Sequence, residues 1–167
     1  MSEFNKKREG FTKIYQDYIE KIYRFVYLKV NTRDSAEDIT SKVFLKCWEA
    51  YKDTKIDNMN AFLYRTANNA VIDYYRENSK KNIISSEYMA SFADMKPSAF
   101  DRSAVSAEVE RIKLALNEIK KEYQDIIIWH YLEDMTIKEI AELTGKTEGN
   151  VRVMAHRGLA ALRKILS

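Results

Sequence analysis

Apolar residues recur at steps of three and four along most of this chain, which is the spacing of one face of an α-helix. Three such stripes fill the first half, at residues 11–26, 36–51 and 63–74. Further stripes cover residues 105–119, 123–131, 137–143 and 151–162. Only four glycines and one proline interrupt the pattern, so turns are few. The pattern predicts an all-α protein made of two small helical bundles.

Between the two sets of stripes the periodicity is lost. Residues 81–104 are rich in serine, contain the only proline and show no sustained period, which is typical of a flexible linker. We therefore expect a first bundle at residues 8–80, a linker at 81–104 and a second bundle at 105–167. A linker of this length reaches on the order of 80–90 Å when extended, so the bundles could work far apart.

Residues with capping chemistry mark several helix starts. The N-cap candidates are Ser35 (with Asp38 three residues later), Asn58, Asn60, Thr136 (with Glu139 three residues later) and Thr147. Gly145 follows the short stripe at 137–143, where a left-handed residue that ends a helix is expected.

The strongest local signal lies at residues 136–162, where a short stripe, a glycine turn and a longer basic stripe follow one another. This order is typical of a helix-turn-helix. With Val151 and Ala155 facing inward, the outward positions are Asn150, Arg152, Val153, His156 and Arg157. Arginine can bond guanine through two hydrogen bonds, and asparagine can do the same with adenine. Duplex DNA binding is favoured, although an ordinary helical hairpin with solvated charges has the same spacing.

Two further clusters allow two interpretations each. Residues 61–81 interleave aromatic, amide and basic side chains, a mixture that suits single-stranded nucleic acid but also a core helix with tyrosines at its edges. Asp34, Glu37 and Asp38 gather at a helix start. They could form an acidic surface for a basic partner or simply stabilise the helix N-terminus.

Enzyme chemistry has little support. The two histidines are far apart, the single cysteine, Cys47, lies in an apolar stripe, and no glycine-rich phosphate loop is present. No run approaches the roughly 20 apolar residues of a membrane span, and the polar N-terminus lacks a signal-peptide core. We therefore expect a cytoplasmic protein that is not an enzyme, with no catalytic residue, metal or cofactor and no membrane insertion.

Three segments in a fixed order carry a family resemblance: DSAEDITSKVFLKCW at 34–48, AFLYRTANNAVIDYYR at 61–76 and YLEDMTIKEIAELTGKTEGNVRVMAHRGLAAL at 131–162. They resemble the extracytoplasmic-function (ECF) sigma factors, the compact class of sigma subunit of bacterial RNA polymerase. The resemblance runs from about residue 11 to the end. It implies a sigma region 2 in the first bundle and a sigma region 4 with the helix-turn-helix in the second.

The resemblance also implies residue roles in transcription initiation. Region 2 docks on the polymerase clamp through an acidic segment that corresponds here to Asp34, Glu37, Asp38 and Ser41. It recognises and melts the −10 promoter element with residues that correspond to Ile56, Asp57, Asn58, Met59, Asn60, Arg65, Asn68, Asn69 and Arg76. Region 4 sits on the polymerase flap and reads the −35 duplex with residues that correspond to Lys146, Thr147, Asn150, Arg152, Val153, His156 and Arg157. The implied partners are the polymerase core, promoter DNA and an anti-sigma factor, which commonly holds members of the family inactive.

The chain departs from the family pattern at a few positions. Ser41 and Lys42 stand where glutamine and glutamate are usual. Met154 and Leu159 replace frequent basic residues of the recognition helix, so we expect fewer phosphate contacts and weaker −35 binding. The alternative is a stand-alone helix-turn-helix DNA-binding regulator, which the second bundle alone would permit.

Overall fold

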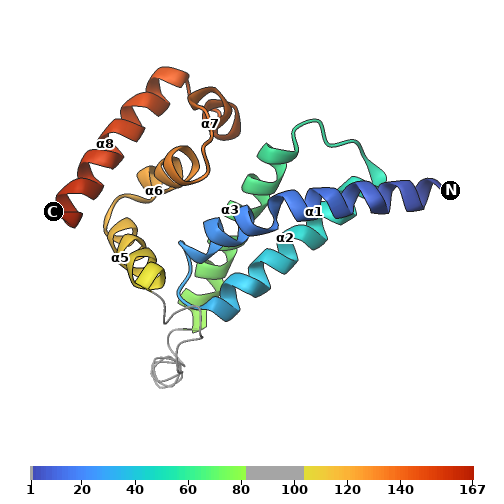
Figure 1. Ribbon diagram of the computed structural model, residues 1–167, viewed down its shortest axis with the longest axis horizontal. Helices are drawn as coiled ribbons and strands as arrows, with labels where there is room; N and C mark the ends of the chain where they lie inside the picture. Colours follow the sequence, from blue (N-terminus) through green and yellow to red (C-terminus); the bar gives the residue numbers. More distant parts are fainter. Residues whose placement is uncertain (1, 82–103) are drawn as a thin grey trace.

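The computed structural model describes residues 2–81 and 104–167, and this described part is helical without any strand. The predicted all-α class is therefore confirmed. Residues 82–103 of the predicted linker lie outside the described residues. Figure 1 shows the helices gathered in two units, an N-terminal one that contains α1, α2 and α3 and a C-terminal one that contains α5 to α8.

The N-terminal unit is a three-helix bundle of α1 (Glu3–Tyr27), α2 (Arg33–Asp53) and α3 (Met59–Lys81). The three predicted stripes face one another, and their central side chains are almost completely buried: Ile22, Phe25, Val43, Leu63 and Val71. Burial of such apolar side chains contributes about 1.5–3 kcal/mol each. The unit thus has a core of its own.

Two helices start earlier than their apolar stripes suggest. α1 begins at Glu3, where the side chain of Ser2 accepts a hydrogen bond from the N–H of Asn5. The N-cap of α2 is Thr32 rather than the predicted Ser35, because the Thr32 hydroxyl accepts from the N–H of Ser35 at 3.1 Å. Polar first turns carry no apolar period, so the stripe alone places the boundary too late.

The C-terminal unit comprises α5 (Ala104–Glu118), α6 (Lys121–Ile127), a π-helical turn (Ile128–Leu132), α7 (Ile137–Thr144) and α8 (Glu148–Leu166). Thr136 caps α7 and Thr147 caps α8, each by accepting from the N–H three residues later. Gly145 has φ 74° and its N–H donates to the carbonyl of Ala141. The predicted helix-turn-helix is therefore built as its capping residues indicate.

Close packing against α6 fixes α8. Gly158 faces α6, where an added Cβ would lie 3.1 Å from Cβ of Tyr123 and from Cγ1 of Ile127. Met154 is also buried, at 7% exposure. Met154 thus packs inward in this structure, and the weaker −35 binding expected from Met154 and Leu159 stays a prediction.

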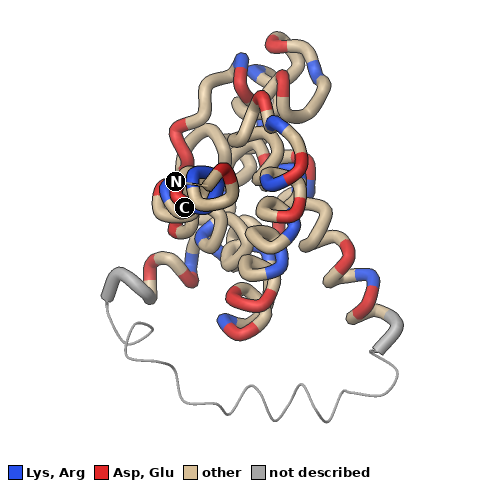
Figure 2. Tube along the Cα trace, turned by 90° about the vertical axis from the view of Figure 1, so that its right-hand side faces the viewer, with Lys and Arg blue, Asp and Glu red and all other residues tan. Residues whose placement is uncertain are grey.

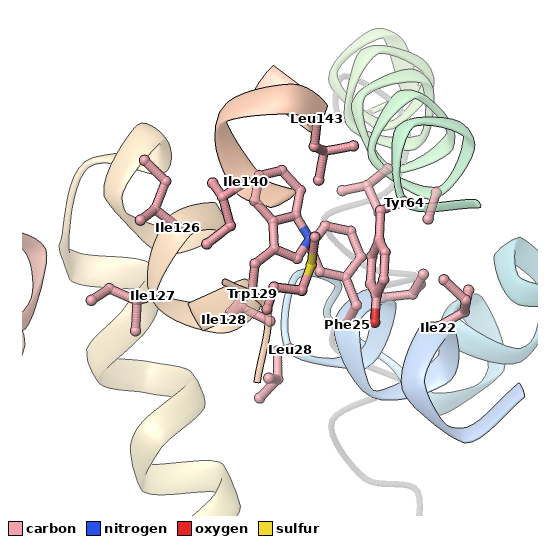
Figure 3. Close-up of a cluster of buried hydrophobic side chains, with 14 of the residues drawn as sticks. Ile22, Phe25, Leu28, Tyr64, Ile126, Ile127, Ile128, Trp129, Ile140 and Leu143 are labelled. Atoms are coloured by element: carbon pink, nitrogen blue, oxygen red, sulfur yellow. The ribbon is translucent and has the colours of Figure 1, made fainter. Parts of the chain in front are cut away.

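The two units also pack directly against each other, although they were expected to be free to separate. Trp129 of the C-terminal unit lies between Ile140 and Leu143 on one side and Phe25 and Tyr64 on the other (Figure 3). Its ring stacks on Phe25 with centroids 5.7 Å apart and an interplanar angle of 9°. The core therefore continues across the boundary between the units.

Candidate polymerase and nucleic-acid interfaces

The acidic segment of α2 lies entirely on the surface. Asp34, Glu37, Asp38 and Ser41 are all exposed. Glu37 pairs with Arg33 at 3.2 Å and Asp38 with Lys42 at 3.0 Å, both one helical turn away. Such exposed pairs are worth little, about 0–1 kcal/mol, so a partner can displace them at low cost.

An apolar feature that the charge pattern did not reveal lies beside this acidic segment. Leu45 is 61% exposed and lines a groove of about 460 Å³ between α2 and α3, together with Asp38, Lys42 and Tyr74. Exposed large apolar residues next to charged ones are common in protein interfaces. The α2 surface therefore combines charges for orientation with an apolar contact.

The recognition helix exposes all of its predicted DNA-contacting side chains. The exposed positions are Lys146, Thr147, Asn150, Arg152, Val153, His156 and Arg157. The opposite face of α8 is fixed by buried Val151, Ala155 and Leu162. The hydroxyl of Thr147 already accepts the capping hydrogen bond of α8. A contact of Thr147 with DNA would be made in addition to that hydrogen bond. The α8 surface is available in the free chain.

Basic and acidic residues are interspersed along the helices of both units (Figure 2), so the position of each charge matters more than the net sign. In the predicted −10 loop, Asp57 and Asn58 are exposed, whereas Ile56, Met59 and Asn60 are half-buried. Asn58 caps α3 by accepting from the N–H of Ala61 at 3.0 Å. On α3, Asn69 and Arg76 are exposed.

Of the remaining two predicted −10 residues, Arg65 contacts the C-terminal unit, whereas Asn68 contacts Lys29 of its own unit, which in turn pairs with Asp125 of the C-terminal unit. The guanidinium of Arg65 donates to the carbonyl of Leu143 at 3.1 Å and to that of Glu142 at 2.9 Å, at the C-terminal end of α7. Asn68 accepts from the ammonium of Lys29 at 2.9 Å. The predicted set is therefore split between the free surface and the contact between the units.

Two ion pairs join the units at this contact. Arg24 donates to both carboxylate oxygens of Glu133 at 2.8 Å, and the hydroxyl of Tyr64 donates to the same carboxylate at 3.2 Å. The hydrogen bonds from Arg24 raise its pKa, and burial raises the pKa of Tyr64. The Glu133 side chain has no exposed surface, so this geometry holds a fully desolvated carboxylate.

The second pair joins Lys29 of the N-terminal unit to Asp125 of α6. The Lys29 side chain is 1% exposed and that of Asp125 15%. Burial disfavours both charges, which lowers the pKa of Lys29 and raises the pKa of Asp125. Their contact and the Asn68 hydrogen bond compensate for that cost.

The sequence did not reveal the residues of these two ion pairs between the units, Arg24, Glu133, Lys29 and Asp125. Lys29 stands alone between Leu28 and Val30 in an otherwise apolar stretch, a signal for a buried cation that needs a partner. Nothing in the spacing identifies that partner as Asp125, 96 residues away. Glu133 and Arg24 look like ordinary solvated charges in the sequence.

Within residues 2–81 and 104–167, no group of His, Cys, Asp and Glu side chains has an arrangement suited to a metal ion. No helix in these ranges is long and apolar enough to cross a membrane.

Comparison with known proteins gives two family matches on one chain. Residues 14–81 match the model of sigma-70 region 2, and residues 109–162 match that of sigma-70 region 4. Curated ECF RNA polymerase sigma factors match nearly the whole chain. The chain belongs to the sigma-70 family, in its ECF class. The order of the two regions is the one expected from the three motifs.

Among these relatives, SigM of Bacillus subtilis is 24% identical over 91% of this chain and 92% of its own length. SigW of the same organism is 26% identical over 95% and 90%. BldN of Streptomyces coelicolor is 22% identical over 95% of this chain, but the chain spans only 61% of BldN.

Two solved structures share the fold of this sigma factor. CnrH, in complex with the cytosolic domain of CnrY, matches with a TM-score of 0.72 and 18% identity over 95% of this chain and 88% of its own. The sigma factor RpoE of Bartonella quintana, in complex with the anti-sigma factor NepR, matches with 0.69 and 17% identity over 95% and 97%.

Proposed function

We propose that this ECF sigma factor directs promoter recognition by dividing the work among three surfaces: the acidic face of α2, the −10 face of α3 with its preceding loop, and the exposed face of α8. The observation that carries the proposal is the match of sigma regions 2 and 4 in order on one chain. A stand-alone helix-turn-helix regulator would have no use for a region 2 bundle with an exposed acidic helix.

The α2 face would bind the polymerase clamp. Glu37 and Asp38 are exposed and make only weak local pairs, and Leu45 offers an apolar contact beside them. Ser41, in place of the usual glutamine, offers a shorter polar side chain on this face. Region 4 would sit on the polymerase flap and hold α8 over the −35 duplex.

The α3 face and the loop at 56–60 would capture the opened −10 strand. Extruding a base costs a few kcal/mol, and stacking on aromatic side chains returns about 1–3 kcal/mol per base. The amides of Asn68 and Asn69 lie on or beside this face, whereas the ring of Tyr64 is buried at 1% exposure. Neither unit alone offers a large DNA contact, so docking on polymerase raises the effective concentration of the second contact.

We further propose that the protein acts in the cytoplasm by binding rather than by catalysis, with no metal or cofactor, and that an anti-sigma factor controls it. NepR is described as the anti-sigma factor bound to RpoE of Bartonella quintana, which shares this fold. In this chain the exposed α2 groove would be one surface for such a partner.

The clamp assignment is tested by reversing charge on α2. Glu37→Lys with Asp38→Lys should weaken binding to the purified polymerase core by at least a hundredfold while circular dichroism stays unchanged, because like charges would then face the partner. The matched control reverses two exposed acidic residues on α1, Glu9→Lys with Asp17→Lys. Retained core binding in the α2 variant would overturn the assignment.

A further inference from the structure

We propose that the C-terminal unit competes with the opened DNA strand for one face of the N-terminal unit, and that this face includes Arg24 and Lys29 in addition to Arg65. The inference rests on the proposed function, because it takes region 2 to bind single-stranded DNA. It adds two binding residues and a form of self-inhibition to that function.

The contact imitates the electrostatics of a nucleic-acid backbone. Three cations of the N-terminal unit each meet an acceptor of the C-terminal unit: Arg24 meets the Glu133 carboxylate, Lys29 the Asp125 carboxylate, and Arg65 two carbonyls at the end of α7. The phosphates of a single strand are bound by rows of cationic side chains of this kind. The row is therefore occupied as long as the units stay together.

The contact also imitates base stacking. Trp129 stacks on Phe25, and its ring is steeply inclined to that of Tyr64, with the two ring centroids 6.3 Å apart. Figure 3 shows the three rings next to one another. A planar ring on an aromatic platform, flanked by cations, is the arrangement that a single-strand binding surface offers to a base. The indole thus takes the place that a base would take.

The masking is selective. The acidic residues of α2 and the predicted DNA-facing residues of α8 are exposed in the same structure. On the shared face, Lys29 has only 1% of its side chain exposed, whereas Arg24 has 48% and Arg65 is exposed around its bonds to α7. The closed chain can therefore meet the polymerase clamp and duplex DNA before it meets the opened strand. Single-strand binding would be delayed until the units separate.

Opening replaces buried contacts by hydrated ones. Lys29, Asp125 and Glu133 are desolvated in the closed state, while Arg24 keeps 48% of its side chain exposed; the three buried groups regain water on separation, which offsets part of the loss of the two ion pairs. The indole N–H of Trp129 is buried without an acceptor among the described residues, so it gains a hydrogen bond when water reaches it. The closed state is then a reversible one, and strand affinity falls in proportion to the open fraction.

The first test follows Trp129 itself. The chain has two tryptophans, so Trp48→Phe leaves Trp129 as the only reporter. In this background Glu133→Gln with Asp125→Asn should shift the emission to the red and increase acrylamide quenching. The matched control is Glu108→Gln with Glu118→Gln, which removes two exposed carboxylates of α5. Glu133→Gln alone should act in the same direction and keeps the test usable if the double variant does not fold.

The second test measures binding of a fluorescent single-stranded 20-mer of mixed sequence to the full chain by anisotropy. The double variant should bind about ten times more tightly, as when an open fraction near a tenth rises to near one. Arg65→Ala, Arg24→Ala or Lys29→Ala in that variant should each reverse part of the gain. The α5 control should bind like the parent chain.

Folded variants that leave Trp129 shielded would overturn the proposal, and so would an exposed Trp129 without any gain in strand binding. Failure of the proposed function appears elsewhere: the core polymerase would then ignore the chain in the α2 charge-reversal experiment, whatever Trp129 does.

Discussion

The two proposed nucleic-acid faces of this sigma factor differ in their accessibility. On α8 and in the turn before it, all the predicted −35 residues are exposed, and the opposite face of the helix is buried through Val151, Ala155 and Leu162. On α3, Arg65 and Asn68 belong to the junction between the units, whereas Asn69 and Arg76 remain on the surface. On the proposed function, the surface that would read duplex DNA is exposed in the free chain, whereas part of the surface that would bind a single strand is engaged in the contact between the units.

The largest effect is expected from removing the two arginines of α8 that are proposed to read bases. Arg152→Ala with Arg157→Ala should weaken polymerase binding to a −35 duplex by about 2–6 kcal/mol, since each bidentate base contact is worth about 1–3 kcal/mol. The salt dependence should also fall. Gel-shift titrations of holoenzyme at two salt concentrations measure both effects.

A control for this prediction is a template that carries only a pre-opened −10 region, on which the double variant should behave like the parent chain. An equal loss on both templates would contradict the separation of the two faces.

The reactivity of Cys47 tests whether the N-terminal core depends on the contact between units. Burial raises the pKa of this thiol from 9.0 to about 11, so at pH 8 its thiolate fraction is about a hundredth of that of an ordinary thiol. Iodoacetamide should therefore modify Cys47 about a hundredfold more slowly than it modifies the urea-unfolded chain. The raised pKa stabilises the folded state below pH 9, and this contribution is lost as the pH rises through 11.

The variant that separates the units, Glu133→Gln with Asp125→Asn, should leave this rate unchanged, because Cys47 lies beside Met59 inside the bundle, with its Sγ 3.6 Å from the sulfur of Met59. Modification as fast as in urea would mean that the two units have no separate stability.

A smaller effect, on stability, is expected from changing Gly158, where α8 packs against α6. Gly158→Val should lower the free energy of unfolding by about 1–3 kcal/mol, because an overpacked position forces α8 away from α6. The new side chain would meet Cβ of Tyr123, which cannot move without its backbone. Thermal denaturation followed by circular dichroism measures the loss, and an unchanged midpoint would show that α8 is not fixed from behind.

The smallest effect on stability is expected from changing Gly145 in the turn of the helix-turn-helix. Gly145→Ala should destabilise the protein by about 1 kcal/mol, because alanine is strained at φ 74°. Gly149→Ala is the matched control on α8, where no atom lies within 4 Å of an added Cβ. It should stabilise by about 0.4–1 kcal/mol. Equal effects at both glycines would contradict the role of Gly145 in the turn.

The sequence was sufficient to predict most features that rest on local chemistry. Helical periodicity placed the helices, and Thr136, Gly145 and Thr147 marked the helix-turn-helix because caps and left-handed turns depend on single residues. The exposed face of α8 followed from the buried one. The start of α2 was placed too late because its first turn, capped by Thr32, is polar.

The contact between the units could not be predicted in this way. Its pairs, Arg24 with Glu133 and Lys29 with Asp125, join residues about a hundred positions apart, and no local period links them. Buried pairs depend on how two finished surfaces meet, so they become visible only with the packing. The assignment of Arg65 and Asn68 to DNA came from family resemblance. A resemblance does not predict the hydrogen bonds that join Arg65 to α7 and Asn68 to Lys29 in the free chain.

The most direct test maps transcription start sites made in vitro by core polymerase on genomic DNA fragments, with and without this chain. The account predicts chain-dependent starts preceded by two conserved elements, with Arg152→Ala relaxing only the upstream element and Asn69→Ala only the downstream one. Starts that do not change when the chain is added, or variants that both alter the same element, would contradict the account.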